Sequence, residues 1–274
     1  VIVDQEGEFD PEKLIAEEDM VITISNQDYI KRNSVRLYRT TGRNTQGANA
    51  METKEEDFVK QLFIASTHDY LMFFTDKGQV YWLKVHEIPQ GGRAARGKPV
   101  VNCIAIGSDE QVASTVAVRE FTDDRWLMFA TRNGTVKKTV LSAYGNVRST
   151  GINAINIDEG DALIDVQLCD ANSDIVLATQ DGMSIRFHQG DVREMGRATA
   201  GVKGIELDAG DAVEHRDRAV EDAQRALDLD GEVDVAGRVD DVDPVVLPLA
   251  GGRGGGDRDP ALLLLLHPVH HRGA

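Results

Sequence analysis

Short apolar runs separated by tight turns are the dominant pattern of this chain. WLMFATRNGTVKK (126–138) and DIVLATQDGMSIR (174–186) each combine an apolar strand, an Asn-Gly or Asp-Gly turn and a second strand. Both dipeptides favour two-residue hairpin turns, because both central residues adopt positive φ angles. YLMFFTDKGQVYWLK (70–84) is a third copy, and MVITISNQDYIKR (20–32) is a fourth, with Asp28 where the others have glycine. The pattern therefore predicts four β-hairpins.

The loops that follow the hairpins repeat with them. GINAINIDEGDA (151–162) and GVKGIELDAGDA (201–212) are offset by 50 residues and are identical at six of twelve positions. Each hairpin is followed by a glycine with an arginine among its four preceding residues, namely Gly47, Gly97, Gly151 and Gly201. Each unit therefore contains two hairpin strands, an Arg/Gly loop, a third strand, an acidic Gly-Asp turn and a fourth strand.

A repeat of about 50 residues is typical of radial or stacked β architectures. We predict an all-β, propeller-like fold built from four-stranded blades; the alternative, a β-sandwich, does not need such a repeat. Helical periodicity is nearly confined to TKEEDFVKQLF (53–63). The predicted domain covers residues 19–213, after an acidic linker segment at 1–18. Its blades are expected at 19–67, 68–122, 123–171 and 172–213.

The composition changes at residue 214. Residues 214–274 use only ten residue types and contain no Ser, Thr, Asn, Lys, Ile, Met, Cys or aromatic residue. All ten types have codons that begin with G or C, as expected when a GC-rich gene is read with its third codon position as the first. The tail is either such an out-of-frame or chimeric extension or a natural low-complexity acidic tail. We expect no metal site at its histidines, because a biased segment supplies no structured partners.

Charge and cysteine content limit the function classes. The net charge of -16 divides into -10 for residues 1–213 and -6 for the tail, which argues against a protein coated in basic residues. A local basic stripe remains compatible with this balance, because salt screens charges beyond about 10 Å. Cys103 and Cys169 lack metal-type spacing and are expected to be reduced thiols of a cytosolic protein. The longest apolar run is too short for a membrane helix, so we expect no membrane partner.

No arrangement of residues typical of catalysis is present in the sequence. There is no G-x-S-x-G motif, and the histidines outside the end of the tail are dispersed. GGRAARG (91–97) follows a strand but opens no helix, which excludes a dinucleotide or P-loop fingerprint. The acidic turns do not alternate ligands as an EF-hand loop does, and turn chemistry explains them. We therefore expect no catalytic residue, metal or cofactor in this chain.

Positive charge recurs at matching places of the repeat. In a propeller these places fall on one edge of the disc, where a curved stripe of cations would neutralise successive DNA phosphates without reading sequence. Glycine in the loops lets the backbone approach a phosphate. The alternatives are a protein-binding propeller and solvated charges that block edge-to-edge aggregation. The candidate DNA contacts are Lys31, Arg32, Arg36, Arg39, Arg43, Gly47, Lys84, Arg93, Arg96, Lys98, Lys137, Lys138, Arg148, Arg186, Arg197 and Lys203.

Three segments resemble the C-terminal domain of the bacterial gyrase A protein, one of the two proteins of DNA gyrase: LIAEEDMVITIS, TKEEDFVKQLFIASTHDYLMFFTDKGQVYWLKVHEIP and GRAARGKPVVN. The resemblance covers residues 14–213 and implies a β-pinwheel of usually six blades joined by strand exchange. It further implies a domain that bends duplex DNA around a basic rim and contributes to negative supercoiling. The remainder of gyrase A, with the cleavage tyrosine, and gyrase B, with the ATPase, would be its partners in a cytoplasmic, nucleoid-associated A2B2 enzyme. ATP and Mg would act through those other domains, so this chain would not be a catalyst alone.

Two features depart from the family pattern. The family box Q-R-R-G-G-(K/R)-G falls on residues 41–47, where only Arg43 and Gly47 match. Only four blades are recognisable, and the tail stands where a fifth and sixth would be. The alternative is therefore a pinwheel that binds DNA without chiral wrapping, as in topoisomerase IV-like relaxation and decatenation, or a protein-interaction propeller.

Overall fold

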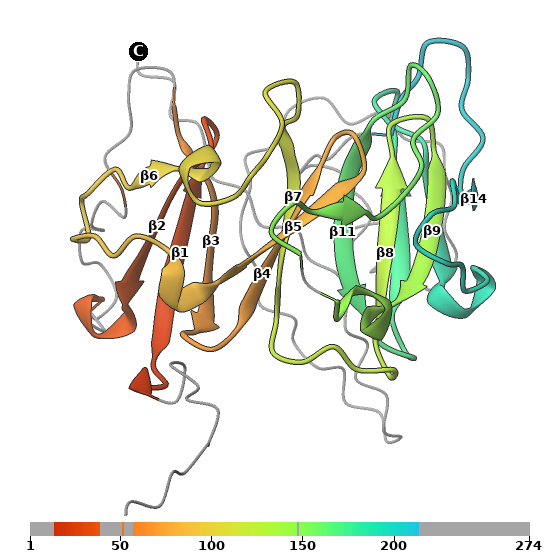
Figure 1. Ribbon diagram of the computed structural model, residues 1–274. Coiled ribbons are helices and arrows are strands. Elements are labelled where there is room, and N and C mark those ends of the chain that lie inside the picture. Colours follow the sequence, from red (N-terminus) through yellow and green to blue (C-terminus); the bar gives the residue numbers. More distant parts are fainter. Residues whose placement is uncertain (1–13, 39–50, 52–56, 147, 214–274) are drawn as a thin grey trace, which may run out of the picture. The chain divides into compact units, whose positions relative to one another are not determined.

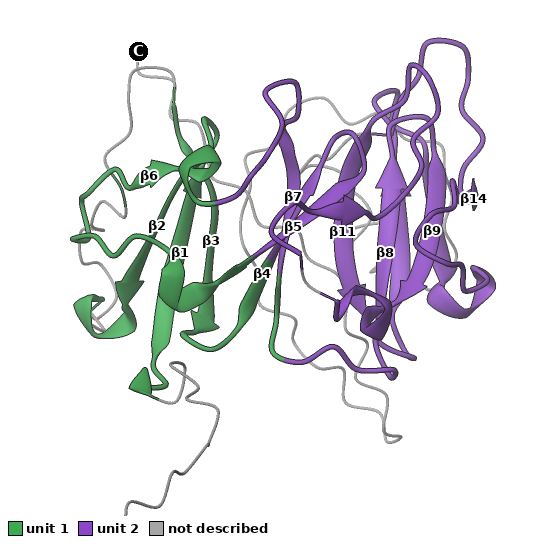
Figure 2. Ribbon diagram, in the orientation of Figure 1, with its two compact units in different colours: residues 1–71, 83–103, 117–119 green, residues 72–82, 104–116, 120–274 purple. Residues whose placement is uncertain are grey.

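The computed structural model describes residues 14–38, 51, 57–146 and 148–213, and in these ranges the fold is all-β (Figure 1). Its helical elements are short 3-10 helices: Val35–Leu37, Val85–Glu87, Leu141–Tyr144 and Gln189–Asp191 each follow the second strand of a hairpin, and Val100–Asn102 follows β6 (Lys98–Pro99). The chain divides into two compact units (Figure 2). Unit 1 contains residues 1–71, 83–103 and 117–119, and unit 2 contains 72–82, 104–116 and 120–274.

Three four-stranded antiparallel sheets and one two-stranded sheet make up the described fold. The first has the order β3-β1-β2-β6, with β1 (Asp19–Ser25), β2 (Tyr29–Ser34), β3 (Val59–Ser66) and β6 (Lys98–Pro99). The second has the order β10-β5-β4-β7, with β4 (Tyr70–Thr75), β5 (Gln79–Lys84), β7 (Val112–Val118) and β10 (Ile152–Asn153). The third has the order β11-β8-β9-β14, with β8 (Trp126–Thr131), β9 (Thr135–Val140), β11 (Leu163–Cys169) and β14 (Val202–Lys203). The fourth pairs β12 (Asp174–Ala178) with β13 (Ser184–His188).

Each four-stranded sheet takes its shortest strand from the repeat that follows it. β6 pairs with β2, β10 with β5, and β14 with β9, in each case through two residues that come directly after the glycine of the Arg/Gly loop. The sheets are thus linked by strand exchange, and a sheet does not coincide with one stretch of sequence. Next to the fourth sheet, an isolated antiparallel bridge joins Thr179 and Val213.

The hairpins form where the sequence predicts them, but residues 57–63, the described part of the segment with a helical signal, contain no helix. Asp28 has φ 57°, the left-handed conformation that glycine adopts in the other three turns, and Asp tolerates it better than most residues. From Val59 the chain is strand β3, which pairs with β1 from Ser66 back to Val59. Cross-strand pairing and burial override local helix propensity here.

Aspartates of the acidic Gly-Asp turns hold the hairpin tips. The Asp161 carboxylate accepts hydrogen bonds from the backbone N–H groups of Asn133, at 2.9 Å, and Ala162, at 2.8 Å. Asp211 accepts in the same way from Asp181, at 3.0 Å, and from Ala212, at 2.8 Å. These carboxylates therefore have a structural role as caps of backbone donors.

The cores consist mainly of aliphatic side chains from the central strands. In unit 1, every residue of the central strand β1 from Met20 to Ser25 is buried, so both faces of this strand are covered. In unit 2, the rings of Phe74 and Phe129 meet edge to face with centroids 5.5 Å apart, and Tyr144 joins them. No helix within the described ranges is long and apolar enough to span a membrane.

Candidate nucleic-acid interface

The Arg/Gly loops are shaped by the glycine before each exchanged strand. Gly97 has φ 86° and Gly201 has φ 116°, conformations that L side chains rarely adopt. A Cβ atom on Gly97 would lie 2.4 Å from the Ile30 carbonyl oxygen, and one on Gly201 would lie 2.5 Å from the Val136 carbonyl oxygen. Glycine therefore lets the loop approach the backbone of the preceding repeat closely, and this contact fixes where the loop arginines lie.

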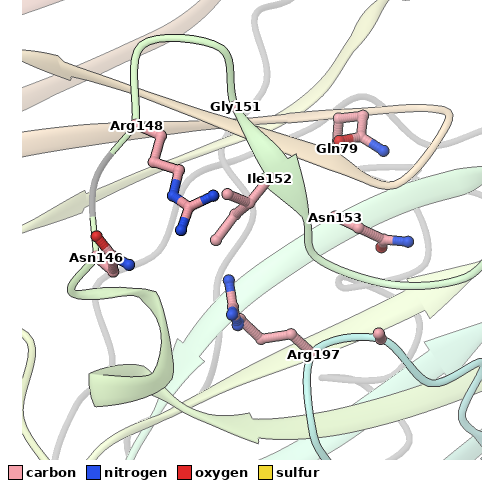
Figure 3. Close-up of a pocket in the computed structure, with 8 residues that line it drawn as sticks. Gln79, Asn146, Arg148, Gly151, Ile152, Asn153 and Arg197 are labelled. Carbon is pink, nitrogen blue, oxygen red and sulfur yellow. The ribbon is translucent and has the colours of Figure 1, made fainter.

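Two of these loops form one pocket in unit 2. Arg148, on the loop before β10, and Arg197, on the loop before β14, point toward the same space from consecutive repeats (Figure 3). The pocket has a volume of about 520 Å³. Its other lining residues are Gln79, Asn146, Gly151, Ile152, Asn153 and Ala198. None of the lining residues is acidic, so two guanidinium groups and several amide donors face an open space without a compensating negative charge.

Lys137 lies against the backbone of the Arg197 loop and is fully buried. Its ammonium group donates a hydrogen bond to the Ala154 carbonyl at 2.6 Å and another to the Arg197 carbonyl. Burial, together with the nearby Arg197 guanidinium, lowers the pKa of Lys137 to about 7. The ammonium group thus holds the backbone of the Arg197 loop and has no surface for a ligand.

The corresponding residue in unit 1 makes the same kind of contact. Lys31 is fully buried, and its ammonium group donates to the carbonyls of Gly92, at 3.2 Å, and Arg93. The next residue, Arg32, donates to the Ile88 carbonyl at 2.7 Å and the His86 carbonyl at 2.9 Å. Burial lowers the pKa of both Lys31 and Arg32.

The other second-strand cations also have partners inside the fold. Lys138 is buried, and its ammonium group donates to the Gln189 carbonyl at 2.8 Å and to the side-chain oxygen of Gln189 at 3.0 Å. Lys84 donates to the His68 carbonyl at 2.9 Å and lies 3.7 Å from the centroid of the Tyr70 ring. Arg186 is exposed but ion-paired with Asp174.

The prediction that the second-strand cations form the outer stripe therefore needs correction. A phosphate cannot reach an ammonium group that is buried among carbonyls, so we exclude Lys31, Lys137 and Lys138 from the proposed interface, and Arg32 has its guanidinium turned to backbone carbonyls. The physical reason is that both faces of these central strands are covered. The alternation of side chains between the two faces of such a strand therefore does not predict which charged side chains face solvent.

The exposed candidates are concentrated in the Arg/Gly loops. Arg148 is exposed and Arg197 half-buried, and neither forms an ion pair with a described residue. Lys203 is exposed and lies 3.0 Å from Glu206. Arg36 lies 4.0 Å from Glu18, with 86% of its side chain exposed. Arg93, Arg96 and Lys98 are exposed on the second loop. Arg39, Arg43 and Gly47 lie outside the described residues.

A comparison with known families matches this repeated architecture. The family described as "DNA gyrase C-terminal domain, beta-propeller" matches four successive segments, residues 19–66, 69–119, 125–170 and 173–215. The chain belongs to this family. The four matched segments correspond to the four repeats, so the predicted family and the predicted propeller-like pinwheel are confirmed.

Relatives and solved structures agree with this assignment. The chain is 44% identical to the gyrase A protein of Halalkalibacterium halodurans over 200 residues, which are 73% of this chain and 24% of that protein. It is 43% identical to the gyrase A protein of Mycolicibacterium smegmatis over 212 residues, 77% of this chain and 25% of that protein. The chain thus spans about a quarter of the length of these relatives.

Two solved structures share the fold. The C-terminal domain of a DNA topoisomerase IV superposes with a TM-score of 0.62 and 32% identity, over 73% of this chain and 60% of that one. A DNA gyrase A C-terminal domain superposes with a TM-score of 0.59 and 22% identity, over 72% of this chain and 64% of that one, which supports the fold alone.

Proposed function

We propose that this gyrase A C-terminal domain binds and bends duplex DNA, and so contributes to negative supercoiling by a type IIA topoisomerase. The observation that carries the proposal is the pocket with Arg148 and Arg197, which two consecutive Arg/Gly loops supply to one space. A guanidinium pair without a carboxylate among the lining residues suits a phosphate of the DNA backbone. Such contacts position DNA and do not read bases.

Exposed cations also occur at the corresponding place of unit 1 and would contact DNA phosphates in the same way. Arg93 and Arg96 lie on the loop of the second repeat, and Lys98 begins β6 directly after it, as Arg148 and Arg197 lie on the loops of the third and fourth repeats. The remainder of gyrase A and gyrase B would be the partners in a cytoplasmic, nucleoid-associated A2B2 enzyme. Strand cleavage, and ATP and Mg chemistry, would belong to those other parts.

A second candidate is DNA binding without chiral wrapping, as in topoisomerase IV-like relaxation and decatenation. One observation favours it: the family box at residues 41–47 retains only Arg43 and Gly47.

Closure of nicked circular DNA by ligase in the presence of the chain separates these functions. Wrapping is expected to shift the linking number with a fixed sign. Retention of DNA without a shift would support the second candidate. If the chain fails to retain duplex DNA at low salt, both candidates are refuted, and a protein-interaction propeller is left.

The pocket is tested by the salt dependence of DNA affinity. Arg148→Ala and Arg197→Ala should each weaken binding to all sequences alike and reduce the salt slope by about 1, because each removes about one phosphate contact. Arg119→Ala is the matched control: it also removes one positive charge, but its guanidinium is paired with Glu17 at 2.7 Å and Asp69 at 3.3 Å. An equal effect of all three substitutions would show that net charge, and not the pocket, determines affinity.

A further inference from the structure

Two buried lysines connect consecutive repeats in the same way. Lys137 is the third residue of β9, and Lys31 is the third residue of β2. Each ammonium group donates to the backbone of the Arg/Gly loop of the next repeat: Lys137 to the carbonyl of Arg197, and Lys31 to the carbonyl of Arg93. Lys137 also donates to the Ala154 carbonyl of its own repeat. In both cases the carbonyl belongs to the first arginine of the loop.

Burying these two ammonium groups costs folding free energy, so stability alone does not explain why lysine occupies these positions. Both side chains are 0% exposed, and removing an ammonium group from water costs free energy that backbone carbonyls repay only with good geometry. An apolar side chain of similar length would fill the same space without that cost. A buried lysine does what an apolar residue cannot, because it fixes the direction of the carbonyls it binds and so the path of the loop.

The other repeats carry different residues at this position. In β5 the third residue is Tyr81, and a Cβ atom on Gly151 would lie 2.6 Å from its ring, so the loop of Arg148 lies against an aromatic face. In β13 the third residue is Arg186, which is paired with Asp174 of its own repeat. The third residue of the second hairpin strand thus contacts the Arg/Gly loop of the next repeat in three of the four repeats. In two of these three, the contact is a hydrogen bond from a lysine.

We propose that Lys31 and Lys137 are positioning residues, each of which fixes the following Arg/Gly loop so that its arginines face DNA. Lys137 would act through Arg197, and Lys31 through Arg93. The inference deepens the proposed function and rests on it. Neither lysine touches DNA in this arrangement.

Loop fixation can be measured without DNA by limited trypsin cleavage of the full chain. The Arg197 and Arg93 carbonyls belong to the peptide bonds that trypsin cuts. Lys137→Met should speed cleavage after Arg197 by about threefold or more, because the hydrogen bond from the Lys137 side chain to the Arg197 carbonyl is lost and native-state cleavage follows local opening. Lys31→Met should do the same after Arg93. Mass spectrometry of early time points gives both rates in one digest.

Each variant is the control for the other. Lys137→Met should leave cleavage after Arg93 unchanged, and Lys31→Met should leave cleavage after Arg197 unchanged. Lys138→Met adds a second control, because it also removes a buried ammonium group, one that binds Gln189 instead of a loop arginine. Unchanged rates at both sites, or faster cleavage at both sites in every variant, would refute the inference.

The effect on DNA is tested by a double-mutant cycle with Lys137→Met and Arg197→Ala. Lys137→Met should weaken duplex binding several-fold and reduce the salt slope, and it should add nothing once Arg197 is alanine. An equal loss in both backgrounds would overturn action through Arg197. If Lys137→Met lowers the melting temperature too far, the cycle of Lys31→Met with Arg93→Ala decides instead. If the unmodified chain does not bind DNA, the proposed function fails, while the cleavage pattern still reports whether the lysines fix the loops.

Discussion

Substitution of Gly201 by alanine is the sharpest test of how the exchanged strands are held. Gly201 precedes β14, which pairs with Thr135 and Val136 of β9. The new Cβ atom would lie 2.5 Å from the Val136 carbonyl oxygen and 2.9 Å from Thr135 Cγ2. Val136 is 1% exposed and lies in a central strand, so its carbonyl cannot move away without breaking the sheet.

The expected magnitude combines two costs and one offset. A non-glycine residue at φ 116° adds strain of about 1–2 kcal/mol. The close contact adds about 1–3 kcal/mol, the usual cost of overpacking. Reduced freedom of the unfolded chain offsets about 0.4–1 kcal/mol. Gly201→Ala should therefore lower the free energy of unfolding by roughly 1–5 kcal/mol.

Gly210→Ala is the matched control in the same unit. Gly210 has φ 94°, and a Cβ atom there would meet nothing within 4 Å, so only the backbone strain applies. Urea denaturation of the full chain, followed by far-UV circular dichroism, gives both values. Gly201→Ala should be the more destabilising by about 1–3 kcal/mol. If the two variants are equally stable, the close approach of the loop to β9 does not contribute, and the reasoning is wrong.

Three further outcomes follow from the buried and paired charges. Because the pKa of Lys137 is lowered to about 7, the native chain has released this proton between pH 7 and about 10.5, while the unfolded chain still binds it. The free energy of unfolding, compared with that of Lys137→Met, should therefore rise with pH across this range, by at most about 1.4 kcal/mol per pH unit. Denaturation series at several pH values measure this rise. Asp211→Ala should cost about 0.5–1.5 kcal/mol in the same assay, because the solvent-exposed Asp181 N–H at the hairpin tip exchanges its carboxylate acceptor for water, and a neutral result would contradict the capping role. Arg186→Ala should cost less than about 1 kcal/mol, because its ion pair with Asp174 is exposed to solvent, and a larger loss would mean that the pair is more than a surface contact.

The sequence by itself determined the local structure and the family. Hairpin turns such as Asn133–Gly134 are specified by adjacent residues, and a repeat of about 50 residues is visible as self-similarity, so neither requires knowledge of distant contacts. The same register placed Arg148 and Arg197 on matching loops. It did not predict that both line one pocket, because that depends on how β10 and β14 pair with the preceding repeats.

Only the tertiary structure decided which cations face solvent. Lys137 and Arg197 are 60 positions apart, and both are positively charged, so spacing and charge assign them the same role. The Arg197 loop, which belongs to the next repeat, packs against β9, and the buried Lys137 ammonium group donates to the carbonyl of Arg197, whose own side chain stays partly exposed. The physical reason is that burial depends on what covers a strand, and in this fold the cover comes from the following repeat.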